Sequence, residues 1–406
     1  MQGAATHVTL RPPDCQSRTP TIMTTDTFDQ LQDRLNSQGV DAMFDELCEH
    51  LESDGKYHEL FDVLLMRSRR ELGLPVILTS SIDDLDEPLR SKVEDAYLAA
   101  CRTVGTLLLR DNKLREAWMY LRPVGDKALV AEAMAKIEPD DDNLQDLIEI
   151  GLHEGVAPGL GYELVLKHYG TCNAITTFEG ALVGRPPSEQ QQAVALLLEH
   201  LHAELLENVR SDIARQQGNP PAESTLAELV ADRDWLFSDN NYHVDTTHLA
   251  STVRFARVVE DPNQLALAYD LTEYGRRLSS QFQFAGDEPF ADVYPSHGLY
   301  FAAQLGRQVD EALAYFRERA EKCDVEEQGT GCAEVYIALL ARLKRYAEAI
   351  DATIRLIPPG VRTSGFAPSL LELSRLCGDY DRLMEVCRQR GDVVSYTAGL
   401  VQRGAR

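Results

Sequence analysis

The sequence predicts an all-α protein, and three observations lead to that prediction. Apolar residues recur at intervals of three, four and seven along most of the chain. Signals for the start and the end of a helix flank the longest of these stretches. Strand patterns are almost absent, because the one short β-like apolar run spans residues 74–78 and contains Pro75, which favours a loop.

The predicted helices in the first third of the chain are short, with one exception. Helical spacing predicts helices at 26–37, 41–52, 57–72, 114–122 and 144–153. A longer helix begins near Pro88, since proline fits the first turn of a helix, where no backbone N–H is needed. Its apolar face extends over about five turns. This face consists of Leu89, Val93, Ala96, Tyr97, Ala100, Cys101, Val104, Leu107 and Leu108.

A second long helix is predicted from Ser188 to Gly218. Ser188 and Gln191 match the capping-box pattern at its start. Gly218, followed by two prolines, is a typical helix end. Further helices are predicted at 247–260, 263–282 and throughout 296–403.

Five short polar turns, each followed by a new helix, indicate an internal repeat. The anchors of the alignment are Tyr57, Leu114, Val309, Tyr346 and Tyr380. Apolar residues occupy the positions ten and seven before each anchor and three and four after it, with His50 as the exception. The last three anchors are 37 and 34 residues apart. A helix, a tight turn and an antiparallel second helix would give that spacing.

This pattern resembles the tetratricopeptide repeat family, whose period is 34 and whose second helix carries an alanine three residues after the anchor. The best matches are the run Tyr346-Ala-Glu-Ala-Ile350, which Pro358 follows, and the stretch from Gly105 to Trp118. The resemblance covers roughly 89–124 and 296–390, with a weaker hairpin at 41–72. It implies helix pairs stacked as an α-α superhelix with a concave surface for a peptide or a partner helix.

The repeat pattern also predicts how the chain is divided. We expect a disordered N-terminal extension at 1–24, N-terminal helical hairpins at 25–126, an irregular helical middle region at 127–292 and C-terminal repeats at 293–406. The first 22 residues lack the apolar core of a secretory signal, and no apolar run is long enough to span a membrane. The eight cysteines are scattered and form no C-x-x-C pair, which favours reduced, mostly buried thiols in a cytoplasmic protein.

The chain is strongly acidic, with 40 Lys and Arg against 65 Asp and Glu and a formal net charge of −25. This charge argues against a non-specific nucleic-acid binder, which needs a basic face. Residues 360–406 hold seven Arg and five acidic residues, so the excess of acid belongs to the rest of the chain. A basic protein or peptide partner is therefore favoured.

The strongest cluster of chemically competent residues is His243, Asp245 and His248. Imidazole and carboxylate groups are ligands for Zn²⁺ or Mn²⁺, and His297 could supply a further ligand. Asp245 is also well placed to cap the helix predicted after it, with His248 in the first turn. A structural cap is the favoured interpretation, and a divalent metal site is the alternative.

Four other motifs suggest chemistry but have structural explanations. His200 and His202 lie on different faces of their helix, so they are not expected to share an ion; an exposed pair of His200 with Glu204 is expected instead. The glycine-rich stretch 155–161 lacks the context of a phosphate loop and is expected to be a loop between helices. The acidic run 140–142 is expected to lead into a helix, and Cys172 to be buried.

Two functions remain. The first is a non-enzymatic scaffold or adaptor that binds a protein or peptide through a concave helical surface. The second is a metal-dependent enzyme on a helical scaffold that uses His243, Asp245 and His248. Neither a nucleic-acid partner nor a membrane partner is expected, and no cofactor is expected apart from the possible divalent metal.

Overall fold

The computed structural model describes residues 25–77 and 81–404, and nearly all of its regular structure is helical. Within these residues there is no strand, and the β-structure is limited to an isolated bridge between Ala285 and Asp292. The all-α prediction is therefore confirmed. The extension predicted at 1–24 lies outside the described residues, as does Cys15. No helix in the described ranges is both long enough and apolar enough to cross a lipid bilayer.

The chain divides into two compact units, with the division between Ile150 and Gly151. It falls inside the region 127–292 that the sequence analysis treats as one irregular middle segment. Each unit is described separately below.

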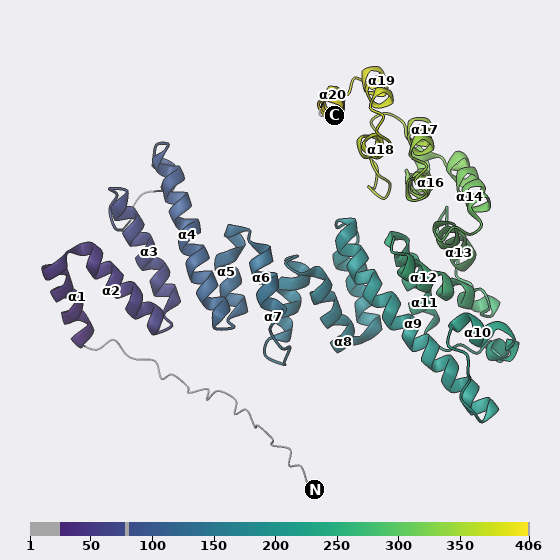
Figure 1. Ribbon diagram of the computed structural model, residues 1–406, viewed down its shortest axis with the longest axis horizontal. Coiled ribbons are helices and arrows are strands. Elements are labelled where there is room, and N and C mark those ends of the chain that lie inside the picture. Colours follow the sequence, from purple (N-terminus) through teal and green to yellow (C-terminus); the bar gives the residue numbers. More distant parts are fainter. Residues whose placement is uncertain (1–24, 78–80, 405–406) are drawn as a thin grey trace, which may run out of the picture. The chain divides into compact units, whose positions relative to one another are not determined.

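The first unit is a succession of packed helices (Figure 1). Its helices are α1 (Thr25–Gln38), α2 (Val40–Ser53), α3 (Tyr57–Glu71), the 3-10 turn η1 (Ile82–Asp84), α4 (Leu89–Arg110), α5 (Leu114–Val124), α6 (Lys127–Met134) and α7 (Leu144–Ile148). The π-helical segment η2 (Glu149–His153) follows directly. Helices α1 to α5 each pack against the next, and both α6 and α7 pack against α5.

The second unit begins with two long helices and continues as shorter pairs. The first part contains α8 (Pro158–Thr177), η3 (Phe178–Leu182), α9 (Pro187–Gln217), α10 (Leu226–Ala231), η4 (Asp234–Asn240), α11 (Thr246–Phe255), η5 (Ala256–Val258), α12 (Pro262–Gly275) and η6 (Ser280–Phe282). The second contains α13 (Val293–Gln304), α14 (Val309–Lys322), α15 (Val325–Gln328), α16 (Gly331–Arg342), α17 (Tyr346–Leu356), α18 (Leu370–Cys377), α19 (Asp381–Arg390) and α20 (Val393–Gly404). Helix α9 packs against α8, α11 and α12, and α16 packs against α14 and α17.

Each of the five repeat anchors marks the start of a helix. Tyr57, Leu114, Val309 and Tyr346 are the first residues of α3, α5, α14 and α17, and Tyr380 immediately precedes α19. The helix pairs α2–α3, α4–α5, α13–α14, α16–α17 and α18–α19 all pack in contact. These paired helices are compatible with a helical-repeat fold.

The same backbone motif closes the first helix in four of these pairs. In α13–α14 the turn has four residues, and Arg307, after Gly306 with its φ of 78°, donates to the carbonyl of Ala302 at 2.7 Å. In the other three of these four pairs the turn has three residues. Gly55, Asn112 and Lys344 each occupy the centre of a three-residue turn with a positive φ of 56° to 69°. The following amide then donates to a carbonyl five residues back, as Lys56 does to Leu51, Lys113 to Leu108 and Arg345 to Leu340, at 2.8–2.9 Å. This is the Schellman arrangement, which reverses the chain and satisfies carbonyls at the helix end.

The small residues of the repeat pattern lie where helices approach closely. Ala117, Ala312 and Ala349, three residues after their anchors, are fully buried. Gly105 on α4 faces α5 so closely that an added Cβ would lie 2.5 Å from Cγ of Leu121. The small side chains at these positions therefore allow the tight contact.

Two local predictions were wrong. Ser188 does not form a capping box, because α9 begins one residue earlier, at Pro187, and its start has no side-chain cap. Only the first three residues of the stretch 155–161 lie in a loop, since residues 154–157 connect η2 to α8 and α8 begins at Pro158. Gly218 does end α9 in the left-handed conformation, as predicted.

We expect the variant Gly105→Ala to lower the free energy of unfolding of the first unit by about 1–3 kcal/mol, because the new methyl group overpacks against Leu121. The chain has two tryptophans, Trp118 in this unit and Trp235 in the other. Urea unfolding followed by Trp118 fluorescence in a Trp235→Phe background measures the effect. Ala99→Ser, at an exposed position of the same helix, is the control and should change stability by at most about 0.5 kcal/mol.

Candidate functional site

A buried chain of hydrogen bonds lies where the residues before α11 meet α9 and α12. His243, 9% exposed, places Nδ1 2.9 Å from the Tyr274 hydroxyl on α12 and Nε2 3.2 Å from Oδ2 of Asp212 on α9. The backbone N–H of His243 also donates to the Tyr274 oxygen, at 2.9 Å. Burial raises the pKa of the Tyr274 phenol, which favours the neutral hydroxyl in this chain.

Further polar contacts attach the same segment to α9 and to η4. Asn208 donates to the carbonyl of His243 at 2.8 Å, and Arg215 forms an ion pair with the second oxygen of Asp212. Asn241 donates to the carbonyl of Leu236 at 3.1 Å. This network fixes the residues that lead into α11, and it occupies both ring nitrogens of His243.

An open hollow of about 450 Å³ lies beside this network. Its lining is almost entirely polar and includes both His243 and Asp245. The lining residues are Glu204, Asn208, Ser211, Asp212, Arg215, Asn241, Tyr242, His243, Val244 and Asp245.

Asp245 caps α11, as the favoured interpretation of the sequence predicted. One carboxylate oxygen accepts the backbone N–H groups of Thr247 at 2.8 Å and His248 at 3.1 Å, and the Thr247 hydroxyl at 2.6 Å. The hydrogen bond from the Thr247 hydroxyl is the main cause that lowers the pKa of Asp245, with the two N–H groups adding to it. His248 lies half-buried in the first turn of α11.

The residues named for a metal site do not form a ligand set in this structure. Both nitrogens of His243 face other partners, and Asp245 is engaged in capping. His297, on α13, stacks on Phe290, with the two ring centroids 4.1 Å apart. In residues 25–77 and 81–404, no group of three or more His, Cys, Asp or Glu side chains is placed to hold a metal ion. The site at His243, Asp245 and His248 stays a prediction.

Elemental analysis of the purified protein tests that prediction. Because a metal ion on His243 would have to displace Tyr274 or Asp212, we expect the wild type to hold well below one equivalent of zinc or manganese. The variants His243→Ala and His248→Ala should give the same value. One equivalent in the wild type that both variants lose would support the enzyme alternative.

The other motifs singled out from the sequence are separated in space or have structural roles. His202 pairs with Asp270 on α12 at 3.3 Å, whereas His200 contacts the hydroxyl of Thr171 at 3.2 Å, so the two histidines have different partners. Cys172 is exposed, which corrects the expectation of a buried thiol. Asp140 accepts the N–H groups of residues 142 and 143 just before α7, as a helix lead-in should.

A second hollow is an acidic groove of about 580 Å³, formed by α8, by α9 and by the start of α12. We call it the acidic groove and define it by its lining residues. They are Gly159, Glu163, Ser188, Gln191, Gln192, Ala195, Leu196, Glu199, Glu260, Asp261 and Gln264. These include four carboxylates and no Lys or Arg, so the groove carries a net negative charge.

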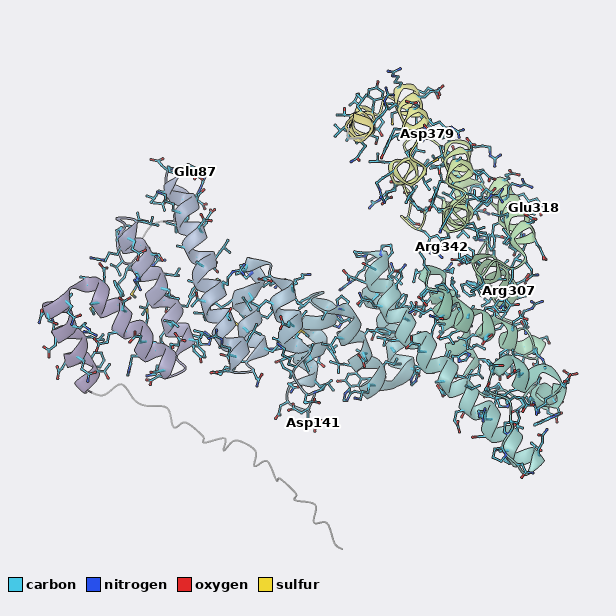
Figure 2. All side chains as sticks on the ribbon, in the orientation of Figure 1. Glu87, Asp141, Arg307, Glu318, Arg342 and Asp379 are labelled. Atoms are coloured by element: carbon cyan, nitrogen blue, oxygen red, sulfur yellow. The ribbon has the colours of Figure 1, made fainter. Side chains whose placement is uncertain are left out.

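The four carboxylates differ in how far their charge is compensated. Asp261 caps α12 and accepts the N–H groups of Asn263 and Gln264 at 2.9 and 3.3 Å. Glu260 lies 3.7 Å from the Arg342 guanidinium, labelled in Figure 2. Glu163 and Glu199 are exposed, and no hydrogen bond or ion pair to either occurs within the described part of the chain. These last two charges face solvent without a protein partner.

Two apolar side chains also line the groove. Ala195 and Leu196 on α9 are partly exposed there, and Gly159 keeps α8 close to α9, since an added Cβ would lie 2.7 Å from Oε1 of Gln192. This groove was not predicted from the sequence. On α9 the lining residues recur at intervals of three and four residues, on a face separate from the buried stripe, and this spacing was a signal in the sequence. The lining residues from α8 and from the start of α12 are brought to this face by tertiary packing, which the sequence pattern does not show.

Comparisons with known protein families, with curated proteins and with solved structures find no match for this chain.

Proposed function

We propose that this protein is a non-enzymatic scaffold built from tetratricopeptide-like helix pairs, and that it binds a basic protein or peptide segment in the acidic groove. The observation that carries the proposal is the groove's composition, with four carboxylates, the apolar side chains of Ala195 and Leu196, and no basic lining residue. Lysine or arginine side chains of a partner would face Glu163 and Glu199, and an apolar side chain would contact Leu196.

The electrostatics of the rest of the chain agree with this partner chemistry. The formal charge of −25 attracts a basic partner over long range and should speed its association at low ionic strength. Exposed charged groups of a site mainly affect the association rate and its salt dependence, whereas contact with apolar side chains such as Leu196 contributes to retention. Binding should therefore weaken as salt is raised.

A peptide-display selection on the full chain tests the proposal. A random library is selected on the wild type, and in parallel on the variant Glu163→Lys/Glu199→Lys, in which both exposed charges are reversed. We expect the wild type to enrich peptides with a net positive charge and one or two apolar residues, and the variant to lose them. Enrichment of acidic or neutral peptides, or of the same peptides on both proteins, would contradict the proposal.

A further inference from the structure

Helix α20 has apolar residues on two opposite faces. Its inner face packs against α19, where Gly399 is buried and an added Cβ would lie 3.2 Å from Cδ2 of Leu383. Its outer face is exposed, although four of its side chains are large and apolar. These are Val393, Val394, Leu400 and Val401, each between 45% and 76% exposed.

The four side chains form one continuous surface with Thr397. At about 100° per residue, the five positions fall within an arc of about 120° around the helix axis. We call this surface the outer face of α20. A contiguous apolar area of this kind typically marks an interaction site, whereas single exposed apolar residues do not.

The outer face can be buried without leaving a polar group unpaired. It holds no charged side chain, and its one polar side chain is Thr397. The Thr397 hydroxyl donates to the carbonyl of Val393 at 2.8 Å, so its hydrogen bond is made within the helix. The face therefore fits an apolar surface and differs in chemistry from the acidic groove.

The order of side chains on the outer face is symmetric about Thr397. Val394 and Leu400 lie three residues before and after it, and Val393 and Val401 lie four residues before and after it. A two-fold axis through Thr397 would place Val394 against the second copy's Leu400, and Val393 against the second copy's Val401. Such a face is complementary to itself when two helices pack antiparallel, as an isologous interface requires.

The charge around the outer face allows two copies to approach each other. Two chains with a formal charge of −25 each repel over most of their surfaces. Residues 379–404, which contain α19 and α20, hold four acidic residues and four arginines, so their net charge is zero. These are Asp379, Asp381, Glu385 and Asp392 against Arg382, Arg388, Arg390 and Arg403.

We propose that the outer face of α20 is a homodimer interface, at which the α20 helices of two copies pack antiparallel about a two-fold axis at Thr397. The face exposes an apolar area on the order of 400 Å² per copy, less than the roughly 800 Å² per partner of a stable complex. The dimer is therefore weak and forms at micromolar concentrations. The inference is independent of the acidic groove, since no residue of α20 lines it.

Sedimentation equilibrium of the full-length protein from 2 to 200 μM tests the proposal. We expect the average mass of the wild type to rise from one chain towards two. The variant Val394→Glu/Leu400→Glu would bring like charges together across the axis, so it should remain monomeric throughout. Met119→Glu/Val183→Glu makes the same charge change at exposed positions outside α20 and should dimerise as the wild type does.

Cysteine cross-linking tests the antiparallel arrangement, in a background in which the exposed Cys172 and Cys377 are replaced by serine. Under mild oxidation, Thr397→Cys should link two copies across the axis. Val393→Cys alone should not, because the two sulfurs would lie about 12 Å apart along the helix direction. The double variant Val394→Cys/Leu400→Cys should link efficiently.

A wild type that remains monomeric at 200 μM overturns the proposal, and the outer face would then be the site of another occupant, such as a helix of a different protein. The proposal is also overturned if Val394→Glu/Leu400→Glu dimerises as strongly as the wild type. Cross-linking of Val393→Cys as readily as Thr397→Cys would indicate a parallel pair and would contradict the two-fold arrangement.

Discussion

The variant Glu334→Gln should lower the free energy of unfolding of the second unit by about 2–4 kcal/mol, because it removes a buried carboxylate that several donors share. Glu334 lies on α16 and is 1% exposed. Its oxygens accept the hydroxyls of Thr330 at 2.5 Å and Ser364 at 2.9 Å. They also accept the backbone N–H groups of residues 364, 365 and 366 at 2.8 to 3.0 Å. The carboxylate thus attaches the segment before α18 to α16.

A glutamine keeps the size of the side chain but replaces one acceptor oxygen by an NH₂ group, which would face backbone donors. Urea unfolding followed by Trp235 fluorescence, in a Trp118→Phe background, reports on the second unit alone. Glu327→Gln, at an exposed position, is the control and should stay within about 0.5 kcal/mol of the parent. Equal effects of the two variants would show that Glu334 is not the anchor of the segment.

The same carboxylate predicts a loss of stability in acid. Burial alone would raise the pKa of Glu334, but the hydrogen bonds from Thr330, Ser364 and Phe366 outweigh it and lower the pKa. The stabilisation is therefore complete above the unfolded-state pKa of about 4.3 and is lost as the pH falls through the folded-state value.

As the pH falls, the effect of His297 on the stability of the second unit should begin at a higher pH than the effect of Glu334. Its ring is 1% exposed, stacks on Phe290 and donates from Nδ1 to the carbonyl of Val293 at 2.6 Å. Burial is the main cause that lowers the pKa of His297 to about 3, and the nearby Arg257 and Arg254 guanidinium groups add to it. The folded protein thus keeps a neutral imidazole where the unfolded chain takes up a proton.

The sign of the effect follows directly. Above pH about 6.5 both states are neutral at this residue, so its stabilisation is complete, and it is lost as the pH falls from there towards 3. The free energy of unfolding should fall by about 1.4 kcal/mol per pH unit from this residue alone, which amounts to about 2 kcal/mol between pH 7.5 and 5.

Urea unfolding at pH 7.5, 6.5, 5.5 and 5.0, followed by Trp235 fluorescence, measures this slope. In His297→Phe we expect the slope of the unfolding free energy against pH to be smaller by about 1.4 kcal/mol per pH unit, the value for one proton. This holds whatever the stability of the variant at pH 7.5. Tyr300→Phe is the matched control, since it removes a fully buried hydroxyl that has no hydrogen-bond partner but leaves the imidazole. An unchanged slope in His297→Phe would contradict the assignment of the acid-induced loss of stability to the protonation of His297 on unfolding.

Local signals in the sequence predicted most of the helices. Three features depend only on residues within one or two turns, so they could be predicted from the sequence alone. They are the start of α4 after Pro88, the end of α9 at Gly218 and the cap at Asp245. The capping box at Ser188 was wrong because Pro187 can start a helix without a side-chain cap.

The sites that depend on distant residues could not be predicted in the same way. Glu334 accepts from donors about 30 residues away, and the Arg257 and Arg254 guanidinium groups near His297 come from residues about 40 positions before it. The acidic groove needs Glu163, Glu199 and Glu260 from three separate segments. The excess of acid in the body of the chain indicated a basic partner, but tertiary packing decides where those charges gather.

The most direct test of the central proposal is the affinity of one selected basic peptide for three proteins. These are the wild type, Glu163→Lys/Glu199→Lys in the acidic groove, and Glu327→Lys/Glu385→Lys at exposed positions outside it, which changes the net charge by the same amount. Fluorescence anisotropy at 50 and 300 mM salt gives the dissociation constants. We expect the groove variant to bind about tenfold more weakly at low salt, the outside variant to stay within about twofold, and the wild type to weaken as salt rises. Equal weakening in the two variants would show that net charge, and not the acidic groove, determines binding, and it would contradict the proposal.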